Sequence, residues 1–522
     1  AFLGTTRYAW TSGIPFVLLG LAAVAGLARS AGASRKYALL AAFGFFAVPA
    51  VFLQASTSYV DVAAAATAMA AFQLVISARD AVVDAHARGG SARGTLFRYL
   101  GLIGVALGLA IGVKSSNLLV CAFVVLAALI QLWRVAPLIG GGAEPRDDSP
   151  RARLRTTVRL VLPGALLVGV PTLLLGSYWY VRTWLRYDNP FYPFTMFGFQ
   201  GEGTVHDIII VPNTPPHWLE QGATETTLDS WWHEHSRHAY SYDVIPGGLG
   251  LQWLFLLIPA VLIGLALLAW KRRFDVIYGF AVPVVVSAAA SPAPWWARYV
   301  LLLPALGVVC LAVLLTELAG RLPEARTTIA GQDWRTRIPL VRRLAAGLVA
   351  LAFVAASATS MWWATSPTHI WTGSDTSWHK ASVKEVIDLM DDPDRNSKIQ
   401  PRQAYAPIRE HVPAGETVAL TEDCGAQFLH LIIGDKGERE IDLLESPRNA
   451  ADLATKLHKS GARYLLLSEA GRDGELLKQV NADPAHYRLL VGPGQIGWFW
   501  LPAGTRIPSA WLFEVGDFPA KP

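Results

Sequence analysis

Residues 158–194 have the sequence "VRLVLPGALLVGVPTLLLGSYWYVRTWLRYDNPFYPF", in which an apolar run gives way to aromatic residues, two arginines and a proline-rich turn. The apolar run extends from about residue 158 to residue 181. A helix of roughly 20 apolar residues crosses the hydrocarbon core of a bilayer, so this run is long enough to do so. The segment therefore predicts a membrane span with a rigid, cationic end.

The end of this span combines interfacial and helix-stopping features. Arg182 and Arg186 are four residues apart and share one helix face while the helix lasts. Asn189 and Tyr192 each precede a proline, which ends the helix and fixes the chain that follows. One interpretation is an aromatic belt at the membrane surface followed by a helix stop. The other is a preformed surface whose residues, Arg182, Arg186, Asn189 and Tyr192, bind a substrate.

Apolar runs of this kind recur along the first 363 residues. The chain is 52% hydrophobic and only 16% charged, which excludes an ordinary soluble protein of 522 residues. Ten spans are predicted, at about residues 13–29, 37–54, 60–79, 99–113, 116–133, 158–181, 249–270, 275–291, 298–317 and 343–363. The predicted fold class is therefore mostly α: a polytopic transmembrane bundle, residues 1–363, with a long loop at 182–248.

Basic residues orient these spans. The loops on one side hold most of the Arg and Lys, within residues 29–36, 79–98, 134–159, 271–273 and 321–343. The opposite loops between spans hold only Lys114, Arg182, Arg186, Arg237 and Arg298. The positive-inside rule places the first set in the cytoplasm, so both termini lie outside it, in a protein of the inner (cytoplasmic) membrane. The net charge of +5 thus reflects topology in a protein surrounded by membrane lipids, and it does not indicate a nucleic-acid partner.

Residues 364–522 differ in composition from the spans. "ETVALTED", "REIDLL", "ARYLLLSEA" and "YRLLVGPGQIGWFWL" have the pattern of short strands, and "SPRNAADLATKLHKSG" that of a helix closed by glycine. We predict a C-terminal α/β domain outside the cytoplasm, without a recognisable catalytic motif. The chain begins at Ala1 without Met, and an outside start needs an upstream span or a cleaved signal. We therefore expect further native residues before Ala1.

Asp61 is predicted at the outer start of a span, after "QASTSYV". One interpretation is a helix N-terminal cap, where a carboxylate is favoured by the helix dipole. The other is a catalytic acid that lines an outward cavity, binds a divalent cation such as Mg²⁺ or Mn²⁺, or orients a sugar hydroxyl. Both can hold together.

Lys114 and Arg298 are candidates for binding an anionic headgroup. Outer loops are otherwise poor in cations, so a lysine in "AIGVKSSNLL" does more than anchor a helix in the interface. Arg298 lies beside Trp295, Trp296 and Tyr299, whose enrichment an aromatic belt alone explains. An arginine at the mouth of a span also suits bidentate recognition of phosphate, with Tyr299 as a neighbour in the site.

The histidines of the long outer loop are a weaker candidate site. His233, His235 and His238 stand with Glu234 in "WWHEHSRHAYSYD". Their spacing matches no closed zinc signature, so metal ligation is the minor interpretation. Contact of His238 with a sugar, beside tryptophans and tyrosines that suit stacking, is the other.

The segments discussed so far resemble, in the same order, those of polytopic glycosyltransferases of the GT-C class, the dolichyl-phosphomannose mannosyltransferase-like enzymes that depend on lipid carriers. "WLRYDNPFYPF" is similar to their Asn-Pro-Phe-Tyr-Pro element, and "STSYVDVAAAA" to their Tyr-x-Asp helix start. "GLAIGVKSSNLL" resembles a Gly-x-Lys loop, "IPGGLGLQWLF" a glycine-rich entry to a span, and "ARYVLLLPAL" an Arg-Tyr-x-x-x-x-Pro element. The resemblance covers most of the chain.

This resemblance implies a transferase that uses a polyprenyl-phosphate-linked sugar on the outer face of the membrane. Lys114, Arg298 and Arg186 would neutralise the phosphate leaving group, with a divalent ion at Asp61. In such enzymes the acidic residue proposed as catalytic lies in the first outer loop. The first span of this chain corresponds to the second span of the family, so that principal base is expected upstream of Ala1.

Two other function classes stay open. The first is a non-catalytic descendant of the same fold that serves as a structural or assembly subunit beside partner membrane subunits. The second is a transporter or channel, which is disfavoured because no charged residue lies near the centre of a predicted span.

Overall fold

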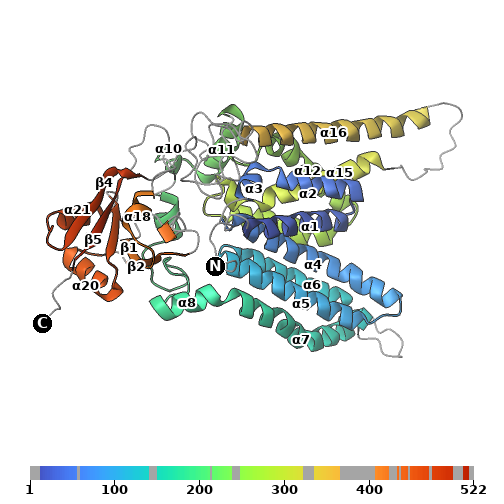
Figure 1. The fold of residues 1–522 in the computed structure, drawn as a ribbon. Helices are drawn as coiled ribbons and strands as arrows, with labels where there is room; N and C mark the ends of the chain where they lie inside the picture. Colours follow the sequence, from blue (N-terminus) through green and yellow to red (C-terminus); the bar gives the residue numbers. More distant parts are fainter. Residues whose placement is uncertain are drawn as a thin grey trace. The chain divides into compact units, whose positions relative to one another are not determined.

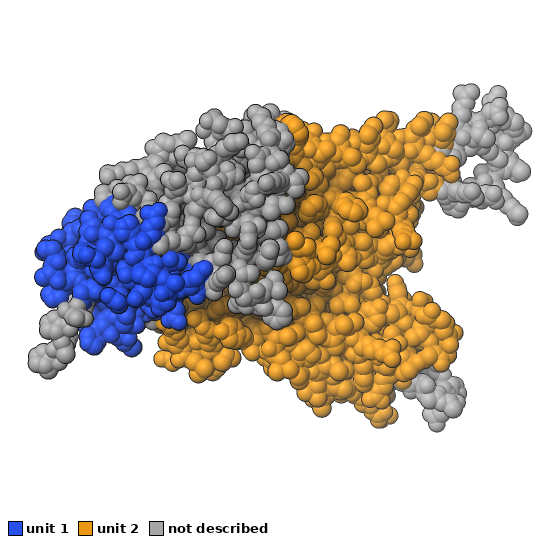
Figure 2. Space-filling model, in the orientation of Figure 1, with its two compact units in different colours: residues 1–10, 365–522 blue, residues 11–364 orange. Residues whose placement is uncertain are grey.

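The computed structural model describes residues 12–55, 59–139, 150–211, 214, 216–237, 247–320, 334–364, 406–421, 432–433, 437–444, 447–468, 473–497 and 509–516. The chain divides into two compact units, which Figure 2 shows in different colours. One comprises residues 11–364, and the other residues 1–10 and 365–522.

The first unit is a helical bundle (Figure 1). Its main helices are α1 (Ile14–Ser30), α2 (Arg35–Phe46), α3 (Pro49–Gln54), α4 (Asp61–Ala87), α5 (Ala92–Val113), α6 (Asn117–Ile139), α7 (Pro150–Gly176), α8 (Tyr178–Tyr187), α12 (Ile258–Trp270), α13 (Phe274–Val276), α14 (Val282–Ala289), α15 (Leu302–Ala319) and α16 (Trp334–Ala364). Two π-helical stretches, η3 (Trp253–Leu257) and η4 (Ile277–Ala281), continue into α12 and α14.

Each predicted span falls largely on helical residues, but the lengths of the helices differ from those predicted. Within the described ranges, 7 helices are long and apolar enough to cross a membrane, and Ile14–Ser30 and Phe274–Ala289 are shorter apolar helices. The predicted span 37–54 is instead divided into α2 and α3, with Pro49 in the first turn of α3. A proline has no amide hydrogen and a fixed φ, so it starts a new helix there and does not continue the old one. The predicted helical membrane bundle is confirmed.

Glycines on one face of α5 allow α7 to approach closely. Gly104, Gly108 and Gly112 are four residues apart, so they lie along a single stripe of the helix. A Cβ atom added to Gly104 would lie 2.5 Å from the carbonyl oxygen of Val168, and one added to Gly108 would lie 2.8 Å from that of Pro171. Backbone contact of this kind is how helices associate where lipid removes the hydrophobic driving force. It fixes the position of α7, and with it the start of α8.

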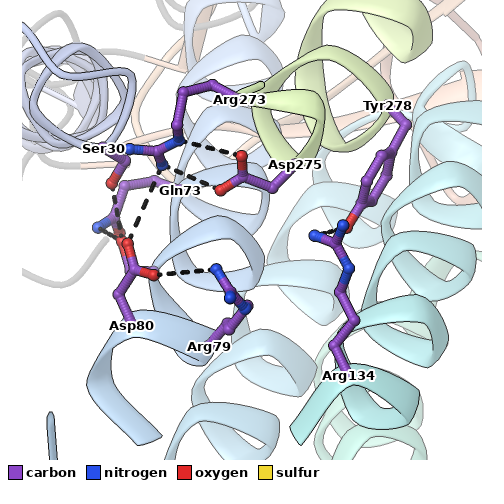
Figure 3. A network of polar contacts seen from close by, with 9 residues as sticks. Ser30, Gln73, Arg79, Asp80, Arg134, Arg273, Asp275 and Tyr278 are labelled. Carbon is purple, nitrogen blue, oxygen red and sulfur yellow. Dashed lines mark hydrogen bonds and ion pairs between the residues drawn. The ribbon is translucent and has the colours of Figure 1, made fainter. Parts of the chain in front are cut away.

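A polar network closes the end of the bundle near the C-terminus of α4 (Figure 3). Arg273 donates two hydrogen bonds to the carboxylate of Asp275, at 3.1 and 2.9 Å, and lies 4.0 Å from Asp80. Asp80 also lies 3.7 Å from Arg79. We call these four residues, Arg79, Asp80, Arg273 and Asp275, the Asp275 cluster. They join α4 to the start of α13.

The second unit contains a five-stranded sheet. Its strands are β1 (Thr417–Thr421), β2 (Glu440–Leu444), β3 (Tyr464–Ser468), β4 (Tyr487–Gly497) and β5 (Ser509–Val515), in the order β2-β1-β3-β5-β4. The first three in this order are parallel, and β5 is antiparallel to both β3 and β4. The helices α18 (Ala406–His411), α20 (Ala450–Ser460) and α21 (Asp473–Asn481) accompany them. The predicted α/β architecture is confirmed, and β5 is a strand that the sequence analysis misses.

Candidate functional site

A cavity of about 670 Å³ lies within the bundle unit, at the end where α4 begins. Its walls come from α4, the α5–α6 turn, α8 with the chain that follows it, α14, and the segment before α15. Most of the lining is apolar or aromatic, including Trp179, Phe191, Met196 and Val284. The charged residues among the described lining are Asp61, Lys114 and Arg298. We call this set, together with Tyr299, the Lys114 cluster.

Asp61 and Lys114 form an ion pair at the cavity wall. The Lys114 Nζ atom donates a hydrogen bond to Asp61 Oδ1. Asp61 is only 5% exposed. The structure places Val60 at the cap position and Asp61 in the first helical turn of α4, where the helix dipole also favours a carboxylate. Asp61 is thus one residue inside the helix instead of at the cap, and its carboxylate accepts from Lys114.

Lys114 ends α5 and lies between two spans. Its backbone is extended, with φ −155° and ψ 126°, so the helix stops there and the side chain turns into the cavity wall. The ammonium group lies 4.1 Å from the ring centroid of Tyr299. Burial lowers the pKa of Lys114, against the charge and hydrogen bond of Asp61, and the nearby positive charge of Arg298 lowers it further. The arrangement favours an additional anion beside this lysine.

Arg298 reaches the same ring from another segment. It belongs to a single 3-10 turn, η5 (Ala297–Tyr299), and its Cζ atom lies 5.2 Å from the Tyr299 centroid. It also lies 5.4 Å from the ring of Tyr59 and 5.6 Å from that of Trp296. Stacking on aromatic faces holds a guanidinium in place. Two cations from different parts of the chain thus converge on Tyr299.

The tryptophans beside Arg298 are core residues, which corrects the expectation of an aromatic belt. Trp296 is 0% exposed and packs in a cluster with Trp295, Ile210 and Trp218. The hydroxyl of Ser230 in α11 (Ala223–Arg237) donates a hydrogen bond of 2.8 Å to the carbonyl of Trp295. The long loop therefore buries these rings and fixes the segment that carries Arg298.

Asn117 is a cavity residue that the sequence analysis misses. Its side-chain amide donates hydrogen bonds to the carbonyl oxygens of Ala64, at 3.2 Å, and Ala110, at 3.0 Å. As the first residue of α6 it therefore joins α6 to α4 and α5 beside the Asp61–Lys114 pair. An asparagine at a predicted helix start was the available signal, but such residues are common caps.

Tyr192 lines the cavity, and Asn189 shapes the turn beneath it. The ring of Tyr192 stacks on that of Tyr187 with centroids 3.9 Å apart, and its hydroxyl donates to Glu202. The buried amide of Asn189 donates to the carbonyls of Phe194 and Gln200, each at 3.0 Å, and its oxygen accepts from the Phe191 amide at 2.8 Å. Asn189 thus holds the backbone, while Tyr192 faces the open space.

The remaining predicted residues lie elsewhere. Arg182 and Arg186 are exposed on α8, with their guanidinium groups 5.2 Å from the ring of Trp179 and 5.4 Å from that of Tyr187. Neither lines the cavity. His238 lies outside the described residues, as do the side chains of His233 and His235.

A divalent cation does not fit the described lining. Mg²⁺ and Mn²⁺ take several oxygen ligands, commonly from more than one carboxylate. Among the described residues of the cavity wall, Asp61 is the one carboxylate, and it already accepts from Lys114. Across the described parts of the chain, no group of three His, Cys, Asp or Glu residues is placed to hold a metal ion.

Comparison with known proteins gives only distant similarities. No family model matches the chain, and no curated protein matches it. Among solved structures it is similar to the oligosaccharyltransferase of Archaeoglobus fulgidus in the apo form, at 12% identity and a TM-score of 0.39, covering 88% of this chain and 59% of that one. For the same enzyme with Zn and sulfate the values are 14%, 0.44, 98% and 61%.

A third similarity is to the oligosaccharyltransferase AglB of the same archaeon, solved with an inhibitory peptide and a dolichol-phosphate. It has 13% identity and a TM-score of 0.38, and covers 96% of this chain and 65% of that one. The chain spans about three fifths of the length of these enzymes. At such scores the similarity carries no information on substrates or catalytic residues.

Proposed function

We propose that this protein is an integral membrane glycosyltransferase that moves a sugar from a polyprenyl-phosphate donor to an acceptor at the outer face of the membrane. The observation that carries the proposal is the convergence of Lys114 and Arg298 on Tyr299 in a largely apolar cavity. The two cations come from distant parts of the sequence. Their shared position suits one anionic group.

The chemistry follows from the charges and the lining. When a sugar leaves its phosphate, negative charge develops on the phosphate oxygens, and fixed cations beside those oxygens lower the barrier. Lys114 supplies a compact charge, and Arg298 supplies a planar set of donors that suits two phosphate oxygens. The apolar wall suits the first isoprene units, and the rings of Tyr192 and Trp179 suit stacking on a sugar.

Asp61 enters the proposal as the partner that positions Lys114. As a catalytic acid or as a cation ligand it would have to act beside the positive charge of Lys114, which already donates to its Oδ1 atom. The exposed Arg182 and Arg186 can contact headgroups at the surface but lie outside the cavity. We therefore assign the phosphate to Lys114 and Arg298.

The proposed side of the membrane rests on the positive-inside rule. The cavity lies at the end of the bundle opposite the loops rich in Arg and Lys, such as residues 271–273. On this basis the cavity and the C-terminal unit face outside the cytoplasm. A cysteine introduced at Ser115 is expected to react with an impermeant thiol reagent added to intact cells. Reaction only after permeabilisation would show that this surface faces the cytoplasm, and the proposed topology would be reversed.

The test of function is transfer from a panel of undecaprenyl-phosphoryl sugars in reconstituted membranes. Lys114→Ala and Arg298→Ala are each expected to lower turnover by about 100-fold or more. Matched controls are Lys271→Ala, which removes an exposed lysine paired with Glu317, and Arg134→Ala, which removes an arginine 5.4 Å from the Tyr278 ring (Figure 3). Both controls should retain turnover. Equal turnover in all four variants would contradict the phosphate site and favour a non-catalytic subunit.

A further inference from the structure

The helix α7 is the least buried of the long apolar helices in the described chain. Only 11% of its apolar stretch is buried, against 44% for α5. One face of α7 packs on the glycine stripe of α5. The opposite face carries a row of residues at helical spacings of three and four, all at least partly exposed: Arg151, Arg155, Arg159, Leu162, Leu166, Gly169 and Leu173. We call this row the α7 outer face.

The arginines of this face lie at the end of the bundle where α4 ends. Contacts between α5 and α7 follow the same order along both helices, with Gly104 beside Val168 and Gly112 beside Leu175. The two helices therefore run parallel, and the start of α7 lies with the start of α5, which follows α4 directly. This end also carries the Asp275 cluster, and the positive-inside rule assigns it to the cytoplasmic side.

The α7 outer face changes from cationic to apolar along its length. Its three arginines span about 12 Å of helix. The apolar part, from Leu162 to Leu173, spans about 16 Å, which is close to half of the roughly 30 Å of a hydrocarbon core. Leu162, Leu166 and Leu173 are 69%, 56% and 66% exposed. The face thus matches one phospholipid of a single leaflet in length and in polarity.

The helix α7 supplies no acid of its own to its arginines. Pro150–Gly176 contains neither Asp nor Glu, and the nearest acids in the sequence, Asp148 and Asp188, lie outside the helix. At the same end of the bundle Arg273 lies against Asp275, so that arginine serves the fold. The arginines of the α7 outer face instead point away from the packed helices, toward the surroundings of the protein.

We propose that the α7 outer face binds an anionic phospholipid of the cytoplasmic leaflet, with the headgroup phosphate at the arginines and an acyl chain along the leucines. A guanidinium donates paired hydrogen bonds to phosphate oxygens, and a cluster of basic residues beside a span attracts anionic lipid. A Cβ atom added to Gly169 would meet nothing within 4 Å, so an acyl chain has room to approach the backbone there. The inference is independent of the proposed function.

A lipid suits this face better than a partner helix does. A helix packed along the whole row would cover three guanidinium groups, and each buried charge needs an opposite charge beside it. A phospholipid leaves the guanidinium groups in the interface, where phosphate and water both reach them. Its apolar part covers only the leucines.

The experiment compares two lipids that differ in headgroup charge. Dioleoyl-phosphatidylglycerol carries one negative charge, dioleoyl-phosphatidylcholine has no net charge, and their acyl chains are the same. Each is titrated into the full chain in detergent, and native mass spectrometry counts the lipids bound per chain. Phosphatidylglycerol is expected to bind about tenfold more tightly than phosphatidylcholine. Glycerol phosphate, which has the charge but no acyl chain, should not displace it.

Two triple variants locate the preference. The first removes the cations of the α7 outer face and carries Arg151→Gln, Arg155→Gln and Arg159→Gln. Its preference for phosphatidylglycerol is expected to vanish. The matched control removes the same charge from exposed arginines on other elements at the same end of the bundle, and it carries Arg35→Gln, Arg88→Gln and Arg272→Gln. This control should keep the preference.

Three results would overturn the proposal. The first is equal affinity of the wild-type protein for the two lipids, or displacement of phosphatidylglycerol by glycerol phosphate. The second is loss of the preference in both triple variants, which would assign it to the general charge of this membrane surface. The third is a wild-type protein that binds neither lipid and forms dimers that Gly169→Trp abolishes, which would make a second copy of the chain the occupant. The first result comes from wild-type protein alone, so it does not depend on the folding of a variant.

Discussion

Two charged clusters lie at opposite ends of α4, and they are built from the same kinds of side chain. Asp61 begins the helix in the Lys114 cluster, and Asp80 stands near its end in the Asp275 cluster. At 1.5 Å per residue the two acids are about 28 Å apart along the helix. That length is close to the roughly 30 Å of a hydrocarbon core.

The clusters differ in what surrounds the charges. In the Asp275 cluster each acid lies beside an arginine, and Arg273 binds both oxygens of Asp275 (Figure 3). In the Lys114 cluster the ion pair of Asp61 and Lys114 lies beside a cavity of about 670 Å³. The two clusters contain the same kinds of charged side chain, so residue type alone does not distinguish a structural ion pair from a candidate binding site. The open space beside the charges does.

The largest expected effect is a loss of stability when the Asp275 cluster is disrupted. Asp275→Asn should lower the free energy of unfolding by about 2–3 kcal/mol, because it leaves the partly buried guanidinium of Arg273 without its bidentate partner. Thermal unfolding in detergent measures this loss, and binding of methyl farnesyl phosphate, a short lipid phosphodiester, to the folded fraction should not change. A variant as stable as wild type would show that the Asp275 cluster does not support the fold.

The second expected effect is a pH dependence of anion binding at Lys114. Burial lowers the pKa of Lys114, and its neighbours Asp61, Arg298 and Tyr299 stay fixed around it. An anion binds the protonated lysine, so affinity for methyl farnesyl phosphate is full below this lowered pKa and falls as the pH rises through it. The loss should reach about tenfold and begin below the pH at which an exposed lysine titrates.

Lys114→Arg is the control for that titration. A guanidinium keeps its proton throughout the accessible range, so the alkaline loss of affinity should disappear in this variant. The same alkaline loss in wild type and in Lys114→Arg would assign the titration to another group.

The smallest effect is expected at the exposed acid of the structural cluster. Asp80 is 55% exposed at its side chain and lies 4.0 Å from Arg273, so solvent screens the pair. Asp80→Asn should cost less than about 1 kcal/mol in unfolding free energy, measured beside Asp275→Asn. A loss as large as that of Asp275→Asn would mean that the whole network, and not the bidentate pair, holds this end of the bundle.

Much of the architecture was predictable because it follows from local patterns. Apolar length identifies the helices of the bundle, and alternating apolar segments identify four of the five strands. The strand β5 escaped because it is defined by its antiparallel pairing with β3 and β4, neither of which adjoins it in the sequence. The break between α2 and α3 at Pro49 has a local signal, the proline, but the sequence analysis missed it because the residues on both sides are apolar.

The candidate site was predictable in part, for a topological reason. Asp61, Lys114, Tyr192, Arg298 and Tyr299 were expected on one membrane surface, and all five line the cavity. Sharing a surface does not establish contact, and Arg182, Arg186 and Asn189 meet the same condition without lining it. Asn117 was missed since its role depends on two carbonyl groups from other helices.

The sequence by itself determined the membrane bundle and the α/β unit, because hydropathy and strand pattern act locally along the chain. Only the tertiary structure decided which cations meet. Lys114 and Arg298 are brought to one ring by the packing of separate helices, and Asp61 is set against one of them by the start of α4. Distances between such side chains depend on helix packing and cannot be predicted from the spacing of the residues along the sequence.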